Sequence, residues 1–425
     1  MAVYTGNLVD RLESVLLLLL LIGGCFPVSA QKPPDEQIRY YQSKLAQDPA
    51  HWPSYAGLGV AYLLKARATD DVAYYAKAEA ALKRSLQLQP NYEALRYLAA
   101  VYIGQHRFQE AIAYGLQTVA TWSSDTRSYV FLSDAYHAIG DYERAAEVAQ
   151  KMLAIKADFY TLSHSARNRY VRGDVEGAIR EMQQALTLAA QDELSRELTP
   201  WVQVQLGRYY FGMGDLRQAE QAYQQALTVS PNDALAIEHL AELRTAQKNF
   251  TVAIKLYRKL LKRRSSPEWR AALAEVYARA GRAAQAQRLR RQAEAAYRRA
   301  IREGRVDYYR HLAQLYLHYD ANLAEALILA QKDLKARQDV YAYDTLAWVY
   351  YKNERYEEAV KAIQAALRWG TKEAQLFFHA GMIYHRLGDA ARARDYLQRA
   401  LATNPYFDVA DAETARAMMK EVGSP

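Results

Sequence analysis

One pattern recurs along most of this chain, and it decides what the chain can fold into. A leucine, or a residue standing in its place, returns at intervals of 33–41 residues. Its positions are Leu58, Leu98, Leu132, Ser165, Leu206, Leu240, Leu273, Leu312, Leu346 and Ala380. An alanine follows the same period, at Ala78, Ala111, Ala145, Ala178, Ala219, Ala253, Ala293, Ala326, Ala359 and Ala393. A period held this long predicts an array of similar structural units.

The stretch 201–231 indicates what each unit is. Leu206 and Tyr210 lie four residues apart, one turn along the same face of a helix. Ala219 and Tyr223 have the same spacing and give a second helix a matching apolar stripe. Gly214 lies between the two stripes, where a turn can use a backbone conformation that other residues avoid. Each unit is therefore expected to be a pair of antiparallel helices.

This unit resembles a tetratricopeptide repeat. The matching residues are Leu206, Gly207, Tyr210, Gly214, Ala219, Tyr223, Ala226 and Pro231. The sequence departs from the pattern at one position, where Gln203 replaces the expected tryptophan. The resemblance implies an all-α, right-handed α-solenoid of about ten helix-turn-helix units with a capping helix at each end.

The chain divides into six segments on this interpretation. We expect a signal peptide at 1–30, an N-terminal capping helix at 31–50 and repeats one to four at 51–190. A connection at 191–200 leads to repeats five to ten at 201–410, and 411–425 forms a solvated C-terminal capping helix. The apolar fraction of 51% suits a folded chain and excludes a disordered one.

The first 30 residues suggest export. An unbroken aliphatic run covers 15–22 and small residues end at Ala30, which is typical of a cleaved secretory signal. The run is too short to span a membrane as a helix. Cys25, the only cysteine, follows Ile22 and two glycines in a setting that loosely resembles a lipoprotein cleavage box. We favour cleavage after Ala30 over lipidation of Cys25, and expect a periplasmic or secreted protein, with a membrane-anchored lipoprotein as the alternative.

Two repeats are longer than the others. Sixteen residues separate Tyr62 from Ala78, and again Tyr277 from Ala293, against nine in the standard unit. Seven extra residues make about two helical turns. We expect each helix of these two hairpins to gain one turn, with no long loop at 66–73 or 281–288.

No pattern typical of an enzyme is present. The sequence lacks the common metalloprotease, phosphate-binding, nucleophile-elbow and dinucleotide-binding motifs. Histidines occupy one recurring place, just before the leucine-type position, at His164, His239, His311 and His379. Only His239 has a carboxylate one turn on, Glu242, so no ligand set repeats and a structural role is favoured over a metal or proton site. We expect no catalytic residue, no metal and no cofactor.

The resemblance also implies a concave groove lined by the first helix of each unit. Carried onto this sequence, it gives the groove residues Tyr160, Tyr170, Trp201, Arg208, Phe211, Tyr341, Asp344, Trp348, Tyr351, Phe378 and His385. Exposed aromatic rings in a concave surface are typical anchors for peptides, and they stack equally well on sugars. The alternative is that some of these rings turn inward.

Positive charge is concentrated in one stretch. Residues 255–310 contain 17 Lys and Arg against 5 Asp and Glu. The basic patch expected there comprises Arg263, Arg264, Arg290, Arg291, Arg298, Arg299 and Arg302. It suits an acidic protein, an anionic envelope polymer or a lipid surface, but a solvated outer face would look the same.

Together these features predict a non-enzymatic scaffold outside the cytoplasm. It would bind a peptide or protein partner in the groove, with the basic patch as a second contact. The alternative is a polysaccharide-handling or assembly component of the cell envelope that holds glycan with the same rings. Nucleic acid is not expected, because it fits the charge but not the export signal.

Overall fold

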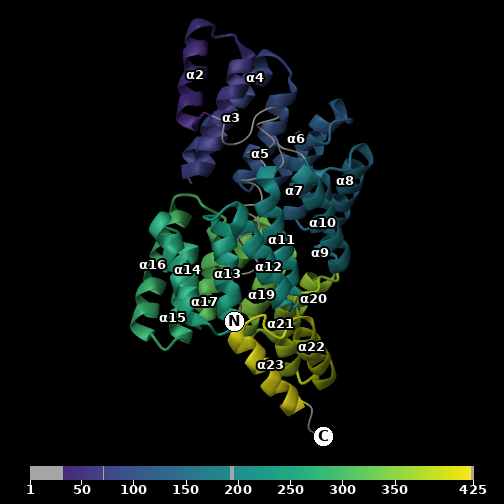
Figure 1. The fold of residues 1–425 in the computed structure, drawn as a ribbon, viewed down its shortest axis with the longest axis vertical. Coiled ribbons are helices and arrows are strands. Elements are labelled where there is room, and N and C mark those ends of the chain that lie inside the picture. The colour runs from purple at the N-terminus through teal and green to yellow at the C-terminus, as the bar shows by residue number, and fades with distance from the viewer. Residues whose placement is uncertain (1–31, 70, 192–195, 423–425) are drawn as a thin grey trace. The chain divides into compact units, whose positions relative to one another are not determined.

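The structure is a computed structural model that describes residues 32–69, 71–191 and 196–422. All regular structure in this described part is helical: 22 α-helices and one 3₁₀ turn, with no strand (Figure 1). The predicted all-α class and the pairing of helices into repeat units are confirmed. The signal peptide expected at 1–30, with Cys25, lies outside the described residues.

The described chain packs as two compact units that divide after Asn168. The N-terminal unit, 32–168, begins with a lone capping helix, α2, and continues with helical hairpins. Its helices are α2 (Pro34–Gln47), α3 (Trp52–Thr69), α4 (Ala73–Leu88), α5 (Tyr92–Gly104), α6 (Phe108–Thr121), α7 (Arg127–Ala138) and α8 (Tyr142–Ile155). α9 (Phe159–Val171) runs across the division. α2 lies within the range 31–50, where a capping helix is expected.

The C-terminal unit, 169–422, contains the six complete hairpins that follow. Its helices are α10 (Val175–Gln191), α11 (Thr199–Gly212), α12 (Leu216–Val229), α13 (Ala234–Ala246), α14 (Phe250–Arg263), α15 (Pro267–Arg279), α16 (Ala283–Arg302), α17 (Tyr308–His318), α18 (Leu323–Ala336), α19 (Val340–Lys352), α20 (Tyr356–Leu367), α21 (Ala374–Arg386), α22 (Ala390–Thr403) and α23 (Val409–Val422). The 3₁₀ turn is η2 (Arg196–Leu198). The joint expected at 191–200 lies inside this unit.

The α11–α12 hairpin shows why the repeat needs its small residues. A Cβ added to Gly207 would lie 2.3 Å from Cε1 of Tyr223, so the two helices cross where no side chain fits between them. Gly214 adopts φ +77° in the turn. The Asp215 side chain then caps α12 by accepting a hydrogen bond from the Gln218 amide.

Gly207→Ala is expected to destabilise the protein by about 1–3 kcal/mol, because the ring of Tyr223 must leave its place to admit one methyl group. Denaturant unfolding followed by circular dichroism measures the loss. Gln221→Ala, on the exposed face of α12, is the matched control. An unchanged midpoint for Gly207→Ala would contradict the close crossing.

The two long repeats extend their helices, but they share the extra residues differently. In the first, α3 has 18 residues against 13 in α13, so it gains the predicted turn, whereas α4 has 16 against 14 in α12 and gains only about half a turn. In the second, α15 keeps an ordinary 13 residues while α16 has 20. The prediction of one extra turn in each helix is therefore wrong for α15 and α16. Gly281 adopts φ +73° after the C-cap residue Ala280 and lies as far from Leu273 as Gly214 lies from Leu206, so the turn keeps its ordinary place and the insertion goes into α16.

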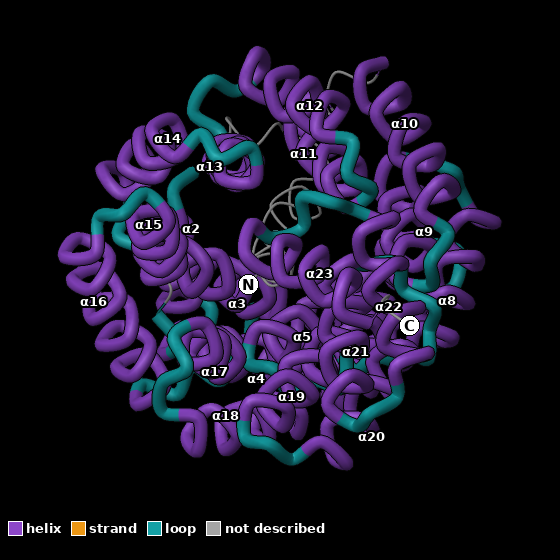
Figure 2. The backbone as a smooth tube through the Cα atoms, turned by 90° about the horizontal axis from the view of Figure 1, so that it is seen from below, coloured by secondary structure: helices purple, strands orange, loops and turns teal. Residues whose placement is uncertain are grey.

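The helices of the C-terminal unit follow one another around a ring. Figure 2 shows α11 to α22 in this order, with the later hairpins returning to the first. Two polar contacts join the two ends: the Thr371 hydroxyl donates to the Val171 carbonyl, and Asn404 Nδ2 donates to the Phe211 carbonyl at 2.7 Å. The unit is thus closed by contacts between residues about two hundred positions apart in sequence.

The C-terminal helix is part of this closure. Asp408, just before α23, forms an ion pair with Arg279 of α15 at 3.0 Å. Asp411 accepts a hydrogen bond from Gln375 of α21 at 3.0 Å, and Glu413 pairs with Lys248 at 2.6 Å. The interpretation of this segment as a merely solvating cap is therefore wrong, because one end of α23 is buried against the inner side of the ring.

Candidate functional site

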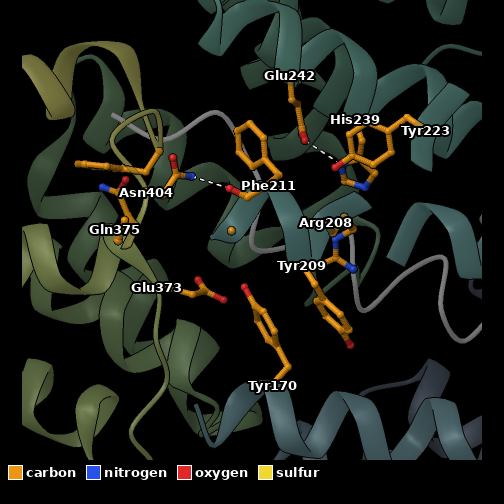
Figure 3. A pocket seen from close by; sticks show the side chains of 13 residues that line it. Tyr170, Arg208, Tyr209, Phe211, Tyr223, His239, Glu242, Glu373, Gln375 and Asn404 are labelled. Carbon is orange, nitrogen blue, oxygen red and sulfur yellow. Dashed lines mark hydrogen bonds and ion pairs between the residues drawn. The ribbon is translucent and has the colours of Figure 1, made fainter. Parts of the chain in front are cut away.

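A cavity opens on the inner side of the C-terminal unit, with a volume of about 60 Å³ (Figure 3). This is enough for several water molecules or one small polar group. Its lining residues are Tyr170, Arg208, Tyr209, Phe211, Gly212, Tyr223, His239, Glu242, Glu373, Ala374, Gln375, Asn404 and Phe407. Polar groups and flat aromatic rings thus share one small space, which is the usual composition of a ligand site.

The periodic repeat brings two of these residues, Arg208 and Glu242, together. Arg208 on α11 and Glu242 on α13 occupy the same place in successive repeats, two residues after Leu206 and Leu240. Stacking of the repeats therefore sets both side chains next to each other on the inner side. The last hairpin, α21–α22, supplies the opposite wall, with Glu373 from the N-terminal end of α21 and Asn404 from the end of α22.

Glu242 and His239 form one hydrogen-bonded pair in the cavity. Nδ1 of His239 lies 2.7 Å from Oε2 of Glu242, and both side chains are almost completely buried. Burial raises the pKa of Glu242 to about 8, against the opposing effect of the Arg208 guanidinium. Burial lowers the pKa of His239 to about 3. Near neutral pH the pair is therefore a neutral carboxyl–imidazole contact.

Glu373 faces two tyrosine hydroxyl groups. The Tyr341 hydroxyl donates to Oε1 of Glu373 at 2.6 Å. The hydroxyl of Tyr170 points toward the same carboxyl group (Figure 3). Burial raises the pKa of Glu373, and the Tyr341 hydroxyl and the Arg208 guanidinium oppose that rise. Burial also raises the pKa of Tyr170 well above its usual value. The second carboxyl group of the cavity is thus also biased toward its neutral form.

Aromatic rings form the remaining walls. Tyr170 and Tyr209 stack with centroids 4.5 Å apart and an angle of 15° between their planes. Tyr223 stacks on His239 at 5.7 Å. Because these rings hold one another in place, the cavity keeps its shape without a ligand.

The predicted groove residues are less exposed than expected. Trp201, Phe211, Trp348 and Phe378 are only 5%, 7%, 5% and 1% exposed, so the expectation of exposed rings is wrong for these four. The other seven are half-buried: Tyr160, Tyr170, Arg208, Tyr341, Asp344, Tyr351 and His385. Of the predicted set, the cavity brings together Tyr170, Arg208 and Phe211. A binding role for the others remains a prediction.

A second aromatic cluster lies on repeats nine and ten. Trp348 stacks between Tyr351, at 4.4 Å, and His379, at 4.1 Å. His379 is fixed from its other side by Asp344, whose Oδ1 lies 2.7 Å from Nδ1. Phe378 packs on Phe407, which lies between α22 and α23, with the two ring centroids 5.7 Å apart. Neighbouring repeats and Phe407 therefore bury these rings.

The recurring histidines have neighbours within the fold. Nδ1 of His164 lies 3.2 Å from the Ser133 hydroxyl, and Nδ1 of His311 lies 3.1 Å from the Asp307 carbonyl. Within residues 32–69, 71–191 and 196–422, no three His, Cys, Asp or Glu side chains are grouped so that they could hold a metal ion.

The basic patch lies on α14 and α16, the second helices of neighbouring repeats, and on Arg264, which follows α14. Arg298 pairs with Glu294 and Glu325, and Arg299 pairs with Glu303. Exposed members of the patch are Arg263, Arg264, Arg291, Arg299 and Arg302, whereas Arg290 and Arg298 are half-buried. α14 carries five basic residues and no acidic one, so its outer surface is strongly positive.

Sequence reasoning placed Tyr170, Arg208 and Phe211 in a binding site and missed the other residues that line the cavity. Glu373, Asn404 and Phe407 occupy no special place in the repeat pattern, and they reach the cavity only because the ring closes. Arg208 and Glu242 could be placed by their shared position in the repeat. No local signal indicates which residues lie opposite them.

No described helix is long and apolar enough to cross a lipid bilayer. Four family profiles, all described as "Tetratricopeptide repeat", match the chain. They cover residues 65–126, 128–159, 159–232, 204–268, 240–286 and 346–420. No curated protein matches the chain.

Several solved structures resemble the chain at low identity. A thermophilic TPR protein of Thermus thermophilus is 23% identical, with 45% of this chain and 98% of that chain covered and a TM-score of 0.39. A tetratricopeptide repeat protein from Parabacteroides merdae is 17% identical, with 63% and 99% covered and a TM-score of 0.37. Yeast Tom70 is 11% identical, with 86% and 95% covered and a TM-score of 0.38. These similarities are too distant to bear on function.

Proposed function

The chain belongs to the tetratricopeptide repeat family, and from this premise we propose that it is a non-catalytic scaffold that binds a protein partner on the inner side of its C-terminal unit. Members of this family generally bind protein partners, and stacked repeats offer an extended concave surface for them. The partner would present an extended peptide or a protein element to that surface.

The cavity is the observation that carries this proposal. Arg208, His239, Glu242 and Glu373 are among the buried or half-buried polar side chains that converge on it, between rings that hold one another in place. A preformed pocket of this kind gives one partner side chain a fixed place, and such anchors dominate the binding energy of protein interfaces. Tyr341, which donates to Glu373, and the neighbouring Asp344 would add contact area.

The outer surface of α14 and α16 is proposed as a second contact. Its exposed arginines would attract an acidic surface of the same partner, which raises the rate of association more than the final affinity. The expected signal peptide supports a site of action outside the cytoplasm, and an anionic envelope polymer would then be an alternative ligand for the basic patch.

Photo-crosslinking from the inner side tests the proposal. A benzophenone amino acid at Gln375, which lines the cavity, should give a protein adduct in cell extract. The same group at Gln225, on the exposed side of α12, should give none. The yield of adduct should fall as salt rises from about 0.1 to about 0.5 M, because the outer contact is electrostatic.

Three outcomes would contradict the proposal. Equal adducts from both positions would mean that the inner side has no preference for the partner. A carbohydrate adduct from Gln375 would favour the glycan-binding alternative. An adduct that forms only from Gln225 would place the contact on the outer surface.

A further inference from the structure

We propose that the cavity binds the cationic side chain of a lysine or arginine presented by the partner. This inference rests on the proposed function, because it names the chemical group that the scaffold holds. It follows from the charges around the cavity, the use of its hydrogen-bonding groups and its aromatic walls.

The charge balance of the lining side chains favours binding of one cation. Glu242 and Glu373 reach the cavity from opposite walls, whereas Arg208 is the one permanently charged base among the lining residues. Nη1 of Arg208 already donates to Gln205 at 2.6 Å, along its own helix. One further positive group would balance both carboxylates, and a buried charge is tolerated only when it is paired.

The hydrogen-bonding groups favour a donor-rich ligand. Oε1 of Gln375 is a buried acceptor without a hydrogen-bond partner among the described residues. Nε2 of the same side chain already donates to Asp411, and Nδ2 of Asn404 donates to the Phe211 carbonyl. Oδ1 of Asn404 in turn accepts from the Tyr406 amide at 2.8 Å, which leaves Oε1 of Gln375 as an acceptor without a partner among the described residues. An ammonium or guanidinium group supplies several donors and no acceptor, whereas an anion would meet two carboxyl groups.

The walls suit the same ligand. The faces of aromatic rings attract a cation within about 6 Å of the ring centroid, most strongly where water is excluded. Tyr170 and Tyr209 stack on one side and Tyr223 lies beside His239 on the other, so a methylene stem can pack between rings while its charged end reaches the carboxyl groups.

Binding should release protons, because a bound cation favours the ionised carboxylates. Glu242 is neutral in the empty cavity near pH 7, since burial raises its pKa to about 8. The titratable groups that face the two carboxyl groups are Arg208, Tyr223, Glu238, His239 and Tyr257 around Glu242, and Tyr170, Arg208, Tyr341 and Asp344 around Glu373. Affinity for a cation should therefore rise with pH up to about 8.

Calorimetry with agmatine and with N-acetyl-arginine amide tests the proposal on the full chain. Both compounds carry a guanidinium group, and the second also mimics a residue within a peptide. We expect binding that is about tenfold tighter at pH 8 than at pH 6.5, with proton release detected by comparing buffers of different ionisation enthalpy. Glu242→Gln and Glu373→Gln should each abolish that release or weaken binding at least fivefold.

Glu303→Gln is the matched control, because Glu303 is exposed on the outer side and pairs with the exposed Arg299. It should leave binding unchanged. Circular dichroism melts keep the test interpretable, since glutamine replaces a neutral buried carboxyl group with little change of shape. Binding of acetate in place of agmatine, or equal binding by both glutamine variants and wild type, would overturn the proposal.

The two proposals fail in different ways. If the partner still crosslinks to Gln375 in the Glu373→Gln variant but neither guanidinium compound binds the wild type, the scaffold role stands and the cation site is wrong. If agmatine binds and no partner crosslinks, the cavity serves a free small cation and the scaffold role is wrong. Selective binding of the peptide-like amide supports a side chain of a protein.

Discussion

Replacing Arg310 with leucine is expected to lower the free energy of unfolding by about 3–5 kcal/mol. Arg310 is completely buried in the C-terminal unit, at 0% exposure. Its guanidinium donates to Asp339 at 3.0 and 2.9 Å and to Asp333 at 2.6 Å. Burial tends to raise the pKa of Asp333, but Arg310 and Arg337 together lower it below its usual value. Removing Arg310 leaves buried carboxylates without their main cation.

Arg302→Leu is the control for this experiment, because Arg302 is exposed at the end of α16. It should change the free energy of unfolding by less than about 0.5 kcal/mol. Denaturant unfolding of both variants, followed by circular dichroism and tryptophan fluorescence, measures the difference. A loss below about 1 kcal/mol for Arg310→Leu would mean that Arg337 alone compensates the two aspartates.

The C-terminal unit should lose stability as the pH rises from 6.5 to 9. Burial raises the pKa of Glu238 to about 8, and the neighbouring Glu242 carboxylate adds to the rise. A carboxyl group with a raised folded pKa holds its proton in the folded state after the unfolded chain has lost it. Stability is therefore highest below the unfolded value of 4.5 and falls as pH rises through about 8. One such group accounts for a loss of about 2 kcal/mol over this range.

Glu238→Gln should remove much of this loss and make the protein more stable than wild type at pH 9. His239 has the opposite effect on the pH dependence. Its pKa is lowered in the folded state, so it reduces the stability of the fold only below pH 6.5, the pKa of an ordinary histidine. The range above pH 6.5 therefore reports on the glutamates. Melting temperatures measured at half-unit steps of pH give the result, with Glu303→Gln as the control. A flat wild-type profile between pH 6.5 and 9 would refute this expectation.

The repeat pattern predicts the hairpins because its causes are local. The four-residue spacing of Leu206 and Tyr210 and the absence of a side chain at Gly207 each act within one unit. The same register places Arg208 beside Glu242. Ring closure has no such signature, because it depends on the small rotation between successive repeats added over the whole unit. Glu373 and Asn404 could therefore not be assigned to the site from the sequence.

The burial of the groove rings has the same origin. Positions that face the concave side in an isolated repeat can be found by counting from Leu346 or Ala380. Whether Trp348 and Phe378 then meet solvent depends on what crosses that side. Phe407 and α23 do so here, and these residues follow the last repeat, where the periodic pattern has ended.

Closure also bears on how this unit can change over evolution. An open solenoid gains or loses a repeat cheaply, because each repeat meets only its neighbours. Here the hydrogen bonds from Thr371 to Val171 and from Asn404 to Phe211 require a fixed number of hairpins between their partners. Deleting or duplicating one hairpin would separate all of these partners at once. We therefore expect descendants of this chain to vary in side chains and loop lengths while keeping their repeat number constant.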